Sequence, residues 1–369
     1  MAKIIMVCGR SPANYYGGIE DHILQISRRL VEKGYDVEIY STLPRIFFKK
    51  TEQVGDLQIT NFPSLAPRET YYLSLQLLHA LRKVKCEIIH GHGVQDFSLL
   101  GSALSKRHNK KVVLTLHTAG FSSLITRMLN IPYRTILKRT LKNADKIICV
   151  SESERQFCNE FLKLPNNYFT VIPNGVDEES LFSKSAHHLF PQKTPFILAV
   201  TRLEKYKGCH YILESFAKLR SYNLKLVIVG SGPHKDELLQ LAKNLRIENN
   251  TIFLGNISKD LLISLYQDCK LFINLSAFEA CPLTILDALS LGKPVITTNS
   301  GSSVFLREIT QKGWAVGVPY PPQPEFVAKK ILEIVSNPSK FVPRDFAIRT
   351  WDDVVQELEK LYSELLIKK

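Results

Sequence analysis

The stretch "KLFINLSAFEACPLTILDALSLGKPVITT", residues 270–298, places an apolar run of strand length on either side of a helix-length segment. Continuous apolar runs are typical of strands buried on both faces, which occur in parallel sheets covered by helices. Pro282 favours the first turn of the helix between them. The stretch therefore predicts a β-α-β unit with Glu279 in the loop before the helix.

The same alternation of apolar runs and amphipathic segments extends toward both ends of the chain, beginning with "KIIMVCG" at residues 3–9. It is interrupted at residues 168–195, where Pro, Gly, Ser and Asn predict a linker. The pattern predicts an α/β fold with two Rossmann-like doubly wound domains facing across a cleft, at residues 1–185 and 186–344. In such folds ligands bind at the carboxyl ends of the strands.

The composition is that of an ordinary globular protein of 369 residues, with 45% hydrophobic and 22% charged residues. No apolar run approaches the roughly 20 residues of a membrane-spanning helix. The N-terminal "MAKIIMVCGR" is too short for a signal peptide, so we expect a cytoplasmic protein. The seven cysteines have no metal-binding spacing and are expected to be reduced thiols.

The positive charge is concentrated in the first half of the chain. Residues 1–174 contain 24 Lys and Arg against 14 Asp and Glu, a net charge of +10, whereas the whole chain carries +13. This asymmetry favours an anionic partner such as a phospholipid surface, a lipid-linked phosphate or nucleic acid. A basic surface without a partner is the alternative, and no nucleic-acid recognition motif is present.

A pair of cations follows the predicted strand that starts the second domain. In "TRLEKYKG", residues 201–208, Arg202 leaves the strand end and Lys207 comes just before the next helix. A guanidinium fork and an ammonium beside a helix start suit a diphosphate. A solvated basic loop is the alternative explanation for these residues.

Glu279 and Asp287 are too far apart to share a proton, since eight residues of helix rise about 12 Å. This spacing does not favour a glycosidase-like carboxylate pair. The backbone amides near Cys281 to Thr284 lie between the two acids, so a ligand with hydroxyls at both ends and negative charge in the middle would fit. A nucleotide-sugar has that layout, and a helix start that merely favours acids is the alternative.

The whole chain resembles the retaining glycosyltransferases of family four, which have the two-domain GT-B architecture. The resemblance covers roughly residues 3–320, and the matching segments come in the order of that family. They are "GGIEDHI" (17–23), "EIIHGHG" (87–93), "TLHTAG" (115–120), "ADKIICVSESE" (144–154), "VIPNGVD" (171–177), "LAVTRLEKYKG" (198–208), "LVIVGSGP" (226–233), "FEACPLTILDAL" (278–289) and "GKPVITT" (292–298). The last segment, about residues 345–369, looks like the helix that returns to the N-terminal domain.

The resemblance implies roles for individual residues around a donor nucleotide-sugar. Glu279 would contact the sugar hydroxyls and Asp287 the ribose, although the family usually has glutamate at the second position. Arg202 and Lys207 would hold the diphosphate, and His117 would lie near the reacting centre. The remaining donor contacts would come largely from the backbone, at Gly17, Gly18, Gly232, Asn256, Ile257, Cys281, Pro282, Leu283 and Thr284.

Two histidines and one serine have structural explanations that compete with functional ones. His90 and His92 fall in a stretch that recurs in the family, but packing at a strand end explains them at least as well. Ser151 begins "SESE", a capping box with Glu154 at its third helical position. The loop at 299–305 also departs from the usual family pattern.

The function that this resemblance implies is retaining, metal-independent transfer of a hexosyl group from a UDP- or GDP-linked sugar. No Asp-x-Asp motif is present, and Arg202, Lys207 and helix amides would supply the charge instead of a metal. We expect no cofactor, and a glycan or lipid-linked acceptor. The basic segment 123–145 would contact an anionic membrane, with an ordinary surface helix pair as the alternative. The rival functions are nucleotide-sugar epimerisation and non-catalytic binding.

Overall fold

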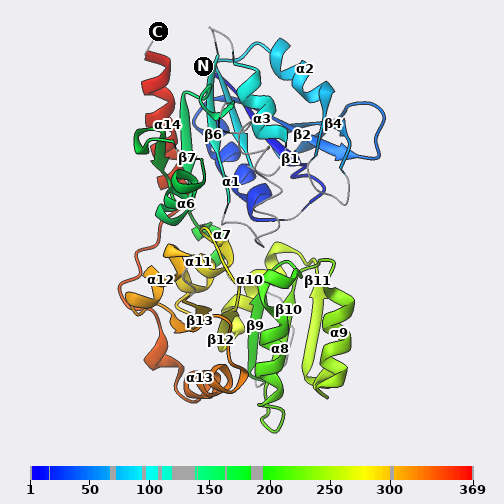
Figure 1. Cartoon of the computed structure of the whole chain (residues 1–369), viewed down its shortest axis with the longest axis vertical. Coiled ribbons are helices and arrows are strands. Elements are labelled where there is room, and N and C mark those ends of the chain that lie inside the picture. The colour runs from blue at the N-terminus through cyan, green and yellow to red at the C-terminus, as the bar shows by residue number, and fades with distance from the viewer. Residues whose placement is uncertain are drawn as a thin grey trace. The chain divides into compact units, whose positions relative to one another are not determined.

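The computed structural model describes residues 2–15, 17–66, 72–93, 97–106, 110–118, 138, 140–162, 164–183, 194–299 and 303–367. The chain divides into two compact units (Figure 1). Unit 1 comprises Met1–Gly175 and Arg349–Lys369, and unit 2 comprises Val176–Ile348. The division falls ten residues before the boundary at 185 that the sequence indicated, and most of the basic segment 123–145 lies outside the described residues.

Unit 1 contains an eight-stranded sheet in the order β3-β4-β2-β1-β5-β6-β7-β8. Only β3 runs antiparallel to its neighbour β4. The strands are β1 (Lys3–Arg10), β2 (Asp36–Pro44), β3 (Lys50–Val54), β4 (Leu57–Ser64), β5 (Ile88–His92), β6 (Lys111–Thr115), β7 (Lys146–Cys149) and β8 (Phe169–Val171). The helices are α1 (Gly18–Glu32), α2 (Leu75–Lys83), α3 (Phe97–Leu104), α6 (Glu152–Leu162) and α14 (Trp351–Ile367).

Two elements of unit 1 were not expected from the sequence. Strand β8 lies in the stretch predicted as a linker, and it forms because residues 169–171 pair with β7. Strands β3 and β4 form a hairpin whose turn contains Gly55 at a φ of 58°. Because β3 is an edge strand with mostly exposed side chains, it lacks the apolar run that identifies a buried strand.

Unit 2 contains a six-stranded sheet in the order β11-β10-β9-β12-β13-β14, with all strands parallel. The strands are β9 (Phe196–Val200), β10 (Lys225–Val229), β11 (Thr251–Gly255), β12 (Leu271–Asn274), β13 (Val295–Thr298) and β14 (Val316–Val318). The helices are α7 (Glu178–Phe182), α8 (Cys209–Ala217), α9 (Lys235–Asn244), α10 (Lys259–Asp268), α11 (Leu283–Ser290), α12 (Val304–Gln311) and α13 (Pro324–Ser336). A short 3-10 turn at Lys205–Lys207 precedes α8.

Alternate residues of the central unit 2 strands enter two separate hydrophobic cores. Ile197 and Ala199 of β9 pack with side chains of α8, α9 and α13, whereas Phe196 and Leu198 pack with those of α10, α11 and α12. Both faces of the sheet are therefore covered, as the continuous apolar runs predicted. This burial fixes the carboxyl ends of the strands, from which the functional loops leave.

The C-terminal helix α14 belongs to unit 1 and packs against α1. Its Trp351 and Tyr362 are almost fully buried. Two ion pairs join the helices, between Arg29 and Asp352 at 3.3 Å and between Lys33 and Glu359 at 2.9 Å. The chain therefore completes unit 1 with residues from both of its ends.

Candidate functional site

The predicted donor residues of unit 2 gather where the order of its strands reverses. Strand β9 has β10 on one side and β12 on the other, so the loops after β9 and β12 leave the sheet edge beside each other. The first of these loops carries Arg202 and Lys207, and the second carries Glu279. Such a switch point is where doubly wound sheets bind ligands.

Lys207 and Glu279 form a largely buried ion pair at this switch point. The Lys207 Nζ lies 2.7 Å from Glu279 Oε1, and their side chains are only 14% and 9% exposed. Burial is the largest single effect and opposes the charge on Lys207, but the charge of Glu279, its hydrogen bond and the neighbouring Tyr206 together raise the pKa of the lysine. Lys207 is therefore an ammonium at neutral pH, with two N–H groups beyond the one facing Glu279.

One carboxylate oxygen of Glu279 receives three polar contacts. Besides the contact with Lys207, Oε1 accepts hydrogen bonds from Ser276 Oγ at 2.7 Å and from Asn274 Nδ2 at 3.3 Å. The hydroxyl of Ser303 holds the Glu279 carbonyl at 2.7 Å. Among the described residues, Oε2 has no hydrogen-bond partner and thus keeps its capacity to accept from a ligand hydroxyl.

Arg202 lies on the same loop as Lys207 but makes different contacts. Its guanidinium pairs with Glu204 at 2.8 Å and donates to Tyr206 Oη at 2.8 Å. The side chain is about half exposed, at 49%. The Tyr206 ring stacks on Phe278, with centroids 4.8 Å apart. The structure thus joins the two predicted ligand loops through an aromatic stack and through the Lys207–Glu279 pair.

Two glycines allow the backbone to pack closely around these loops. Gly208 has a φ of 73°, and a Cβ there would lie 2.1 Å from the carbonyl oxygen of Leu275. A Cβ on Gly232 would lie 2.4 Å from the carbonyl oxygen of Leu203. Only glycine fits either position without a backbone shift.

The other predicted donor residues lie on the neighbouring loops and on α11. Asn256 Oδ1 accepts from Ser231 Oγ at 3.2 Å, and Ile257 packs against the core. Pro282 immediately precedes α11, which begins at Leu283 and Thr284 and whose first turn has no side-chain cap. Its amides are thus available to an anion. The Cys281 side chain is buried, so a donor contact at this residue would come from its backbone.

Asp287 lies inside α11, as its fifth residue, at intermediate exposure. Burial of Tyr266 raises the pKa of its hydroxyl well above the ordinary value, and the nearby charge of Asp287 adds to this effect. Glu279, in contrast, lies four residues before the first residue of α11. The two acids therefore occupy a loop and a helix, separated by the α11 N-terminus.

The predicted residues of unit 1 gather at its own switch point. Strand β1 lies between β2 and β5, and α1 follows β1 with Gly17 as its N-cap and Gly18 as its first residue. Arg10, the last residue of β1, pairs with the buried Glu20 of α1 at 2.7 Å. Because a helix start binds anions through free amides, this turn is suited to the role that the resemblance implied.

His117, which is partly exposed, belongs to a cluster with three buried histidines that the sequence did not predict as a unit. It follows β6, has a φ of 52°, and its Nε2 lies 3.1 Å from Nδ1 of His92 at the end of β5. The ring of His22, from α1, meets the His117 ring edge-on at a centroid distance of 4.6 Å. His22 bonds through Nδ1 to Asn174 Oδ1 at 2.9 Å and also contacts Trp351 of α14.

His90 joins this cluster through its contact with His92. Its two nitrogens bond to Tyr362 Oη at 2.6 Å and to Thr115 Oγ1 at 2.7 Å, and its ring lies against His92. His90 is therefore a packing residue, whereas His92 contacts His117 directly. His22, Asn174, Trp351 and Tyr362 were missed because their proximity depends on the fold. The only sequence indication was the polar His22 on the buried face of an amphipathic helix.

All four histidines are neutral at physiological pH because the loss of surrounding water opposes a positive charge on each ring. Burial lowers the pKa of His22 to about 4 and that of His90 to about 3. It also lowers the pKa values of His92 and His117 well below the ordinary range, with the neighbouring histidines adding to the effect. His117 is thus a neutral hydrogen-bonding group rather than a cation.

Three of these histidines could hold a metal ion. Among the described residues, His22, His92 and His117 have potential ligand atoms within 4.8 Å of one another. Neutral imidazoles are zinc ligands, but two of these nitrogens already bond to each other at 3.1 Å. A hydrogen bond between neutral imidazoles thus accounts for the His92–His117 contact without a metal.

Glu154 connects α6 to the strand end that carries His117. Its backbone N–H donates to Ser151 Oγ at 3.2 Å, which confirms Ser151 as the helix cap, but its carboxyl does not return the bond to the Ser151 N–H that the predicted capping box requires. Its carboxyl accepts from the backbone N–H of Val150 at 2.6 Å and from that of Thr118. Burial raises its pKa to about 8, against the lowering effect of these two N–H groups. Glu154 therefore positions the residue that follows His117.

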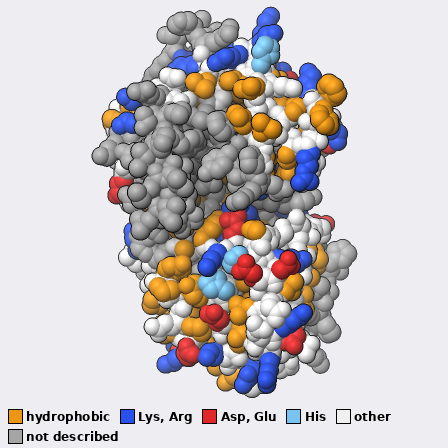
Figure 2. All heavy atoms as spheres, turned by 45° about the vertical axis from the view of Figure 1, so that its right-hand side comes forward, with side chains coloured by type: hydrophobic (Ala, Val, Ile, Leu, Met, Phe, Trp, Pro, Cys, Tyr) orange, Lys and Arg blue, Asp and Glu red, His pale blue; other side chains and the backbone are white. Residues whose placement is uncertain are grey.

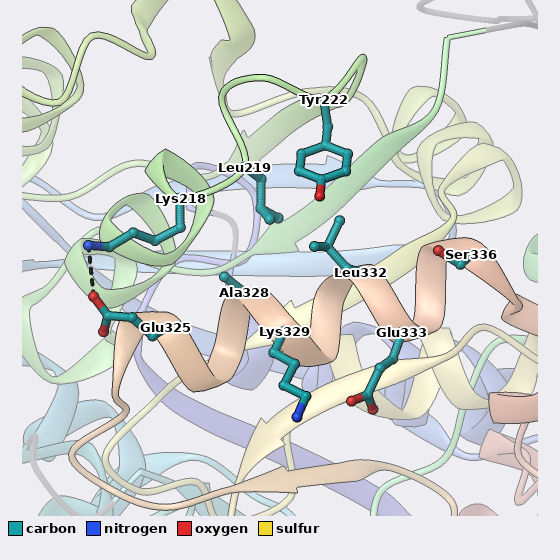
Figure 3. Close-up of a pocket in the computed structure, with 9 residues that line it drawn as sticks. All are labelled: Lys218, Leu219, Tyr222, Glu325, Ala328, Lys329, Leu332, Glu333 and Ser336. Carbon is teal, nitrogen blue, oxygen red and sulfur yellow. Dashed lines mark ion pairs between the residues drawn. The ribbon is translucent and has the colours of Figure 1, made fainter.

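One groove of the described residues is unrelated to the predicted donor residues. It has a volume of about 530 Å³ and lies between the end of α8 and α13, where Leu219, Tyr222 and Leu332 form an apolar wall (Figure 3). A Lys218–Glu325 ion pair of 2.8 Å borders it.

Comparison with known proteins identifies both halves of the chain. Residues 16–180 match the family described as Glycosyltransferase Family 4, and residues 182–345 match Glycosyl transferases group 1. A phosphatidylinositol N-acetylglucosaminyltransferase subunit of Arabidopsis thaliana is 26% identical over 95% of this chain and 79% of that protein. The alpha-monoglucosyldiacylglycerol synthase of Streptococcus pneumoniae is 25% identical over 76% of this chain and 67% of that protein.

The fold is shared with solved structures of low sequence identity. Anabaena HepE in complex with UDP and glucose has a TM-score of 0.76 and 17% identity, covering 99% of this chain and 100% of that one. The two matched segments span nearly the whole sequence, and the strand orders above give each half a Rossmann-like sheet. The chain therefore belongs to the glycosyltransferases of family four, with the GT-B fold, and its activity is glycosyl transfer.

Proposed function

We propose that the chain is a retaining, metal-independent hexosyltransferase that uses a UDP- or GDP-linked sugar and a lipid-linked acceptor. The observation that carries the proposal is the Lys207–Glu279 pair at the switch point of unit 2. It presents a permanent cation and a carboxylate oxygen with free accepting capacity. A sugar joined to a diphosphate requires both of these groups side by side.

In the proposed donor complex, Glu279 Oε2 accepts hydrogen bonds from sugar hydroxyls. Lys207 keeps its contact with Oε1 and directs its other N–H groups to the diphosphate. The uncapped amides of α11 and the exposed Arg202 add positive potential. The UDP and glucose bound to HepE support a donor of this class.

In the proposed reaction the acceptor hydroxyl attacks the anomeric carbon on the face from which the diphosphate leaves. The bond from that carbon to the phosphate oxygen breaks, and the departing oxygen takes the proton of the hydroxyl. Charge on the leaving diphosphate is stabilised by Lys207 and Arg202 rather than by a metal. His117, neutral at physiological pH, contributes a hydrogen bond and not a positive charge.

The proposed acceptor is lipid-linked. Two relatives have names that contain phosphatidylinositol and diacylglycerol, and the first half of this chain carries a net charge of +10. No described helix is long and apolar enough to cross a bilayer. The proposal therefore places the protein at the surface of an anionic membrane.

Steady-state kinetics of Glu279→Gln and Lys207→Met test the donor site. Each change leaves one member of a buried ion pair without its partner, which costs about 2–5 kcal/mol. We expect kcat/KM for the donor to fall about 100-fold or more. Glu333→Gln, on the distant helix α13, is the matched control, with expected kinetics of the wild type. Unchanged kinetics in Glu279→Gln would contradict the assigned role.

The stereochemistry and metal dependence need separate measurements. NMR of the product should show the anomeric configuration of the donor, and the rate should not change in EDTA. An inverted product would contradict retention, and a loss restored by Mg²⁺ or Zn²⁺ would contradict metal independence. Formation of an epimer of the donor sugar without any acceptor would instead support the epimerase alternative.

A further inference from the structure

Four highly exposed hydrophobic side chains lie at one corner of unit 1. Phe47 is 86% exposed, Phe48 84%, Leu75 74% and Leu65 71%. The next most exposed phenylalanine among the described residues, Phe182, is only 52% exposed. Scattered single exposures are normal, but large apolar side chains gathered in one place indicate an interaction site.

The topology of the sheet brings these four residues together. Strands β2 and β4 are parallel neighbours that end in register, with Pro44 opposite Ser64. The segment 45–49 follows β2, and Leu65 follows β4 directly, so both leave the same sheet edge. Leu65 also pairs with Leu73, which brings Leu75 at the start of α2 to this edge. The four residues define what we call the β2–β4 corner.

Positive charge accompanies the hydrophobic side chains. The sequence "RIFFKK", residues 45–50, contains three cations and no acid. Lys50 pairs with Glu52 at 2.7 Å, whereas Arg45 and Lys49 have no ion-pair partner among the described residues. In Figure 2, hydrophobic side chains and those of Lys and Arg lie next to one another on the unit 1 surface.

The mixture of phenylalanine and lysine favours a lipid surface over a protein partner. Lysine is depleted in protein–protein interfaces, so a patch with adjacent lysines fits them poorly. An anionic bilayer satisfies both components, because aromatic rings enter the boundary between headgroups and acyl chains while cations remain among lipid phosphates. Arg45, at a φ of 66°, ends β2 in a turn that directs the chain into the exposed Phe47 and Phe48.

The β2–β4 corner lies at the carboxyl ends of the parallel strands, where the candidate site of unit 1 also lies. Strands β1, β2, β5 and β6 are parallel, so Pro44, Gly17 and His92 all follow or lie at carboxyl ends. A bilayer that contacts the corner is thus at the edge where the histidine cluster lies. We propose that the β2–β4 corner inserts Phe47 and Phe48 into an anionic membrane and holds unit 1 beside its lipid-linked acceptor.

This inference deepens the proposed function, since it rests on a lipid-linked acceptor. Co-sedimentation of the full chain with phosphatidylcholine vesicles, with and without 30% phosphatidylglycerol (about one lipid in three, enough to create an anionic surface), tests it. We expect binding to the anionic vesicles that weakens at high salt. The double variant Phe47→Ser/Phe48→Ser should lower the partition coefficient at least about tenfold, because it removes two inserted rings.

Matched control variants distinguish vesicle binding by the β2–β4 corner from non-specific hydrophobic or electrostatic binding. Phe182→Ser removes an exposed phenylalanine from unit 2 and should bind vesicles as the wild type does. Arg45→Ser/Lys49→Ser should weaken binding to anionic vesicles, whereas Lys235→Ser/Lys243→Ser on α9 should not. In the Phe48→Trp variant, the fluorescence emission of the introduced tryptophan should shift to shorter wavelength when anionic vesicles are added. Such a shift reports that position 48 itself enters the membrane.

Four results would overturn the inference. The wild type would not bind anionic vesicles, the Phe47→Ser/Phe48→Ser variant would bind as strongly as the wild type, or Phe48→Trp would show no shift. A concentration-dependent dimer that the double variant abolishes would also overturn it and assign the corner to contact between two copies. None of these results affects donor binding or product stereochemistry measured without vesicles, so failure here is distinguishable from failure of the proposed transferase activity.

Discussion

Asp287 and Glu279 show how one substitution in a family pattern becomes a specific structural question. Glu279 is held in a loop by Ser276, Asn274 and Lys207, whereas Asp287 belongs to helix α11. A helical position one to two turns from the N-terminus fixes the backbone, so side-chain length decides how far the carboxylate reaches. The shorter aspartate reaches less far by one methylene.

We expect Asp287→Glu to preserve or improve donor affinity if Asp287 holds the ribose. The longer side chain shortens the distance to a hydroxyl without altering the charge. Calorimetric titration with the donor nucleotide measures the change, and Asp287→Asn, which removes the charge, is the comparison. A large loss of affinity in Asp287→Glu would mean that the pocket is built around the shorter side chain.

His92 should influence catalysis through His117. Replacement by leucine removes the 3.1 Å bond that orients the His117 ring. We expect kcat to fall about tenfold or more while the donor KM stays near the wild-type value, since the donor residues of unit 2 are intact. His92→Asn places an amide near the position of Nδ1 and should restore part of kcat. An equal loss in both variants would argue for packing alone.

At the scale of the element, the turn between β9 and α8 depends on a single glycine. Gly208→Ala should destabilise unit 2 by at least about 2 kcal/mol, because it combines the left-handed backbone with a close approach to Leu275. Gly313→Ala is the matched control, with a similar φ of 72° but no atom within 4 Å of the added Cβ. Denaturant unfolding should show a clearly smaller loss for Gly313→Ala, and equal losses would contradict the steric explanation.

Helix α14 shows what a single element adds from the far end of the chain. It supplies Trp351 to His22 and Tyr362 to His90, and it pairs its acids with Arg29 and Lys33 of α1. The helix thus supplies side chains that contact two members of the histidine cluster. Its amphipathic pattern predicts a buried face, but it does not identify which residues that face will contact.

At the scale of the whole molecule, the buried histidines should make unit 1 sensitive to acid. The folded pKa of His22 is about 4, below the unfolded value near 6.5, so the folded state binds fewer protons in this range. Its contribution to stability is present above the unfolded pKa and is lost as the pH falls from about 6.5 to 4. The loss is about 1.4 kcal/mol per pH unit for one histidine.

Unfolding curves between pH 7 and pH 5 measure this dependence. His22→Asn removes one titrating group and should reduce the slope by about one proton, because asparagine stays neutral throughout the range. Gln76→Asn, an exchange of two neutral amides at an exposed position on α2, is the control and should leave the slope unchanged. An unchanged slope in His22→Asn would mean that His22 is not neutral in the folded protein.

Much of the fold could be predicted because it depends on local patterns. The apolar runs identified the buried parallel strands, and Pro282 correctly located the start of α11. The edge strand β3 and the short strand β8 were missed, since neither has a continuous apolar run. The unit boundary lies at Gly175 instead of 185 because α7 packs against α10 of unit 2, where Lys259 pairs with Asp177 and Gln267 donates to the carbonyl of Leu181.

The sequence by itself determined the two Rossmann-like units and the loop positions of Arg202, Lys207 and Glu279, because strand ends and helix starts are encoded locally. Only the tertiary structure decided which polar groups meet. Lys207 reaches Glu279 across 72 residues, and His90 reaches Tyr362 across 272. Parallel sheets place strands in an order different from that of the sequence, so the neighbours of a strand end are fixed only when the sheet has formed.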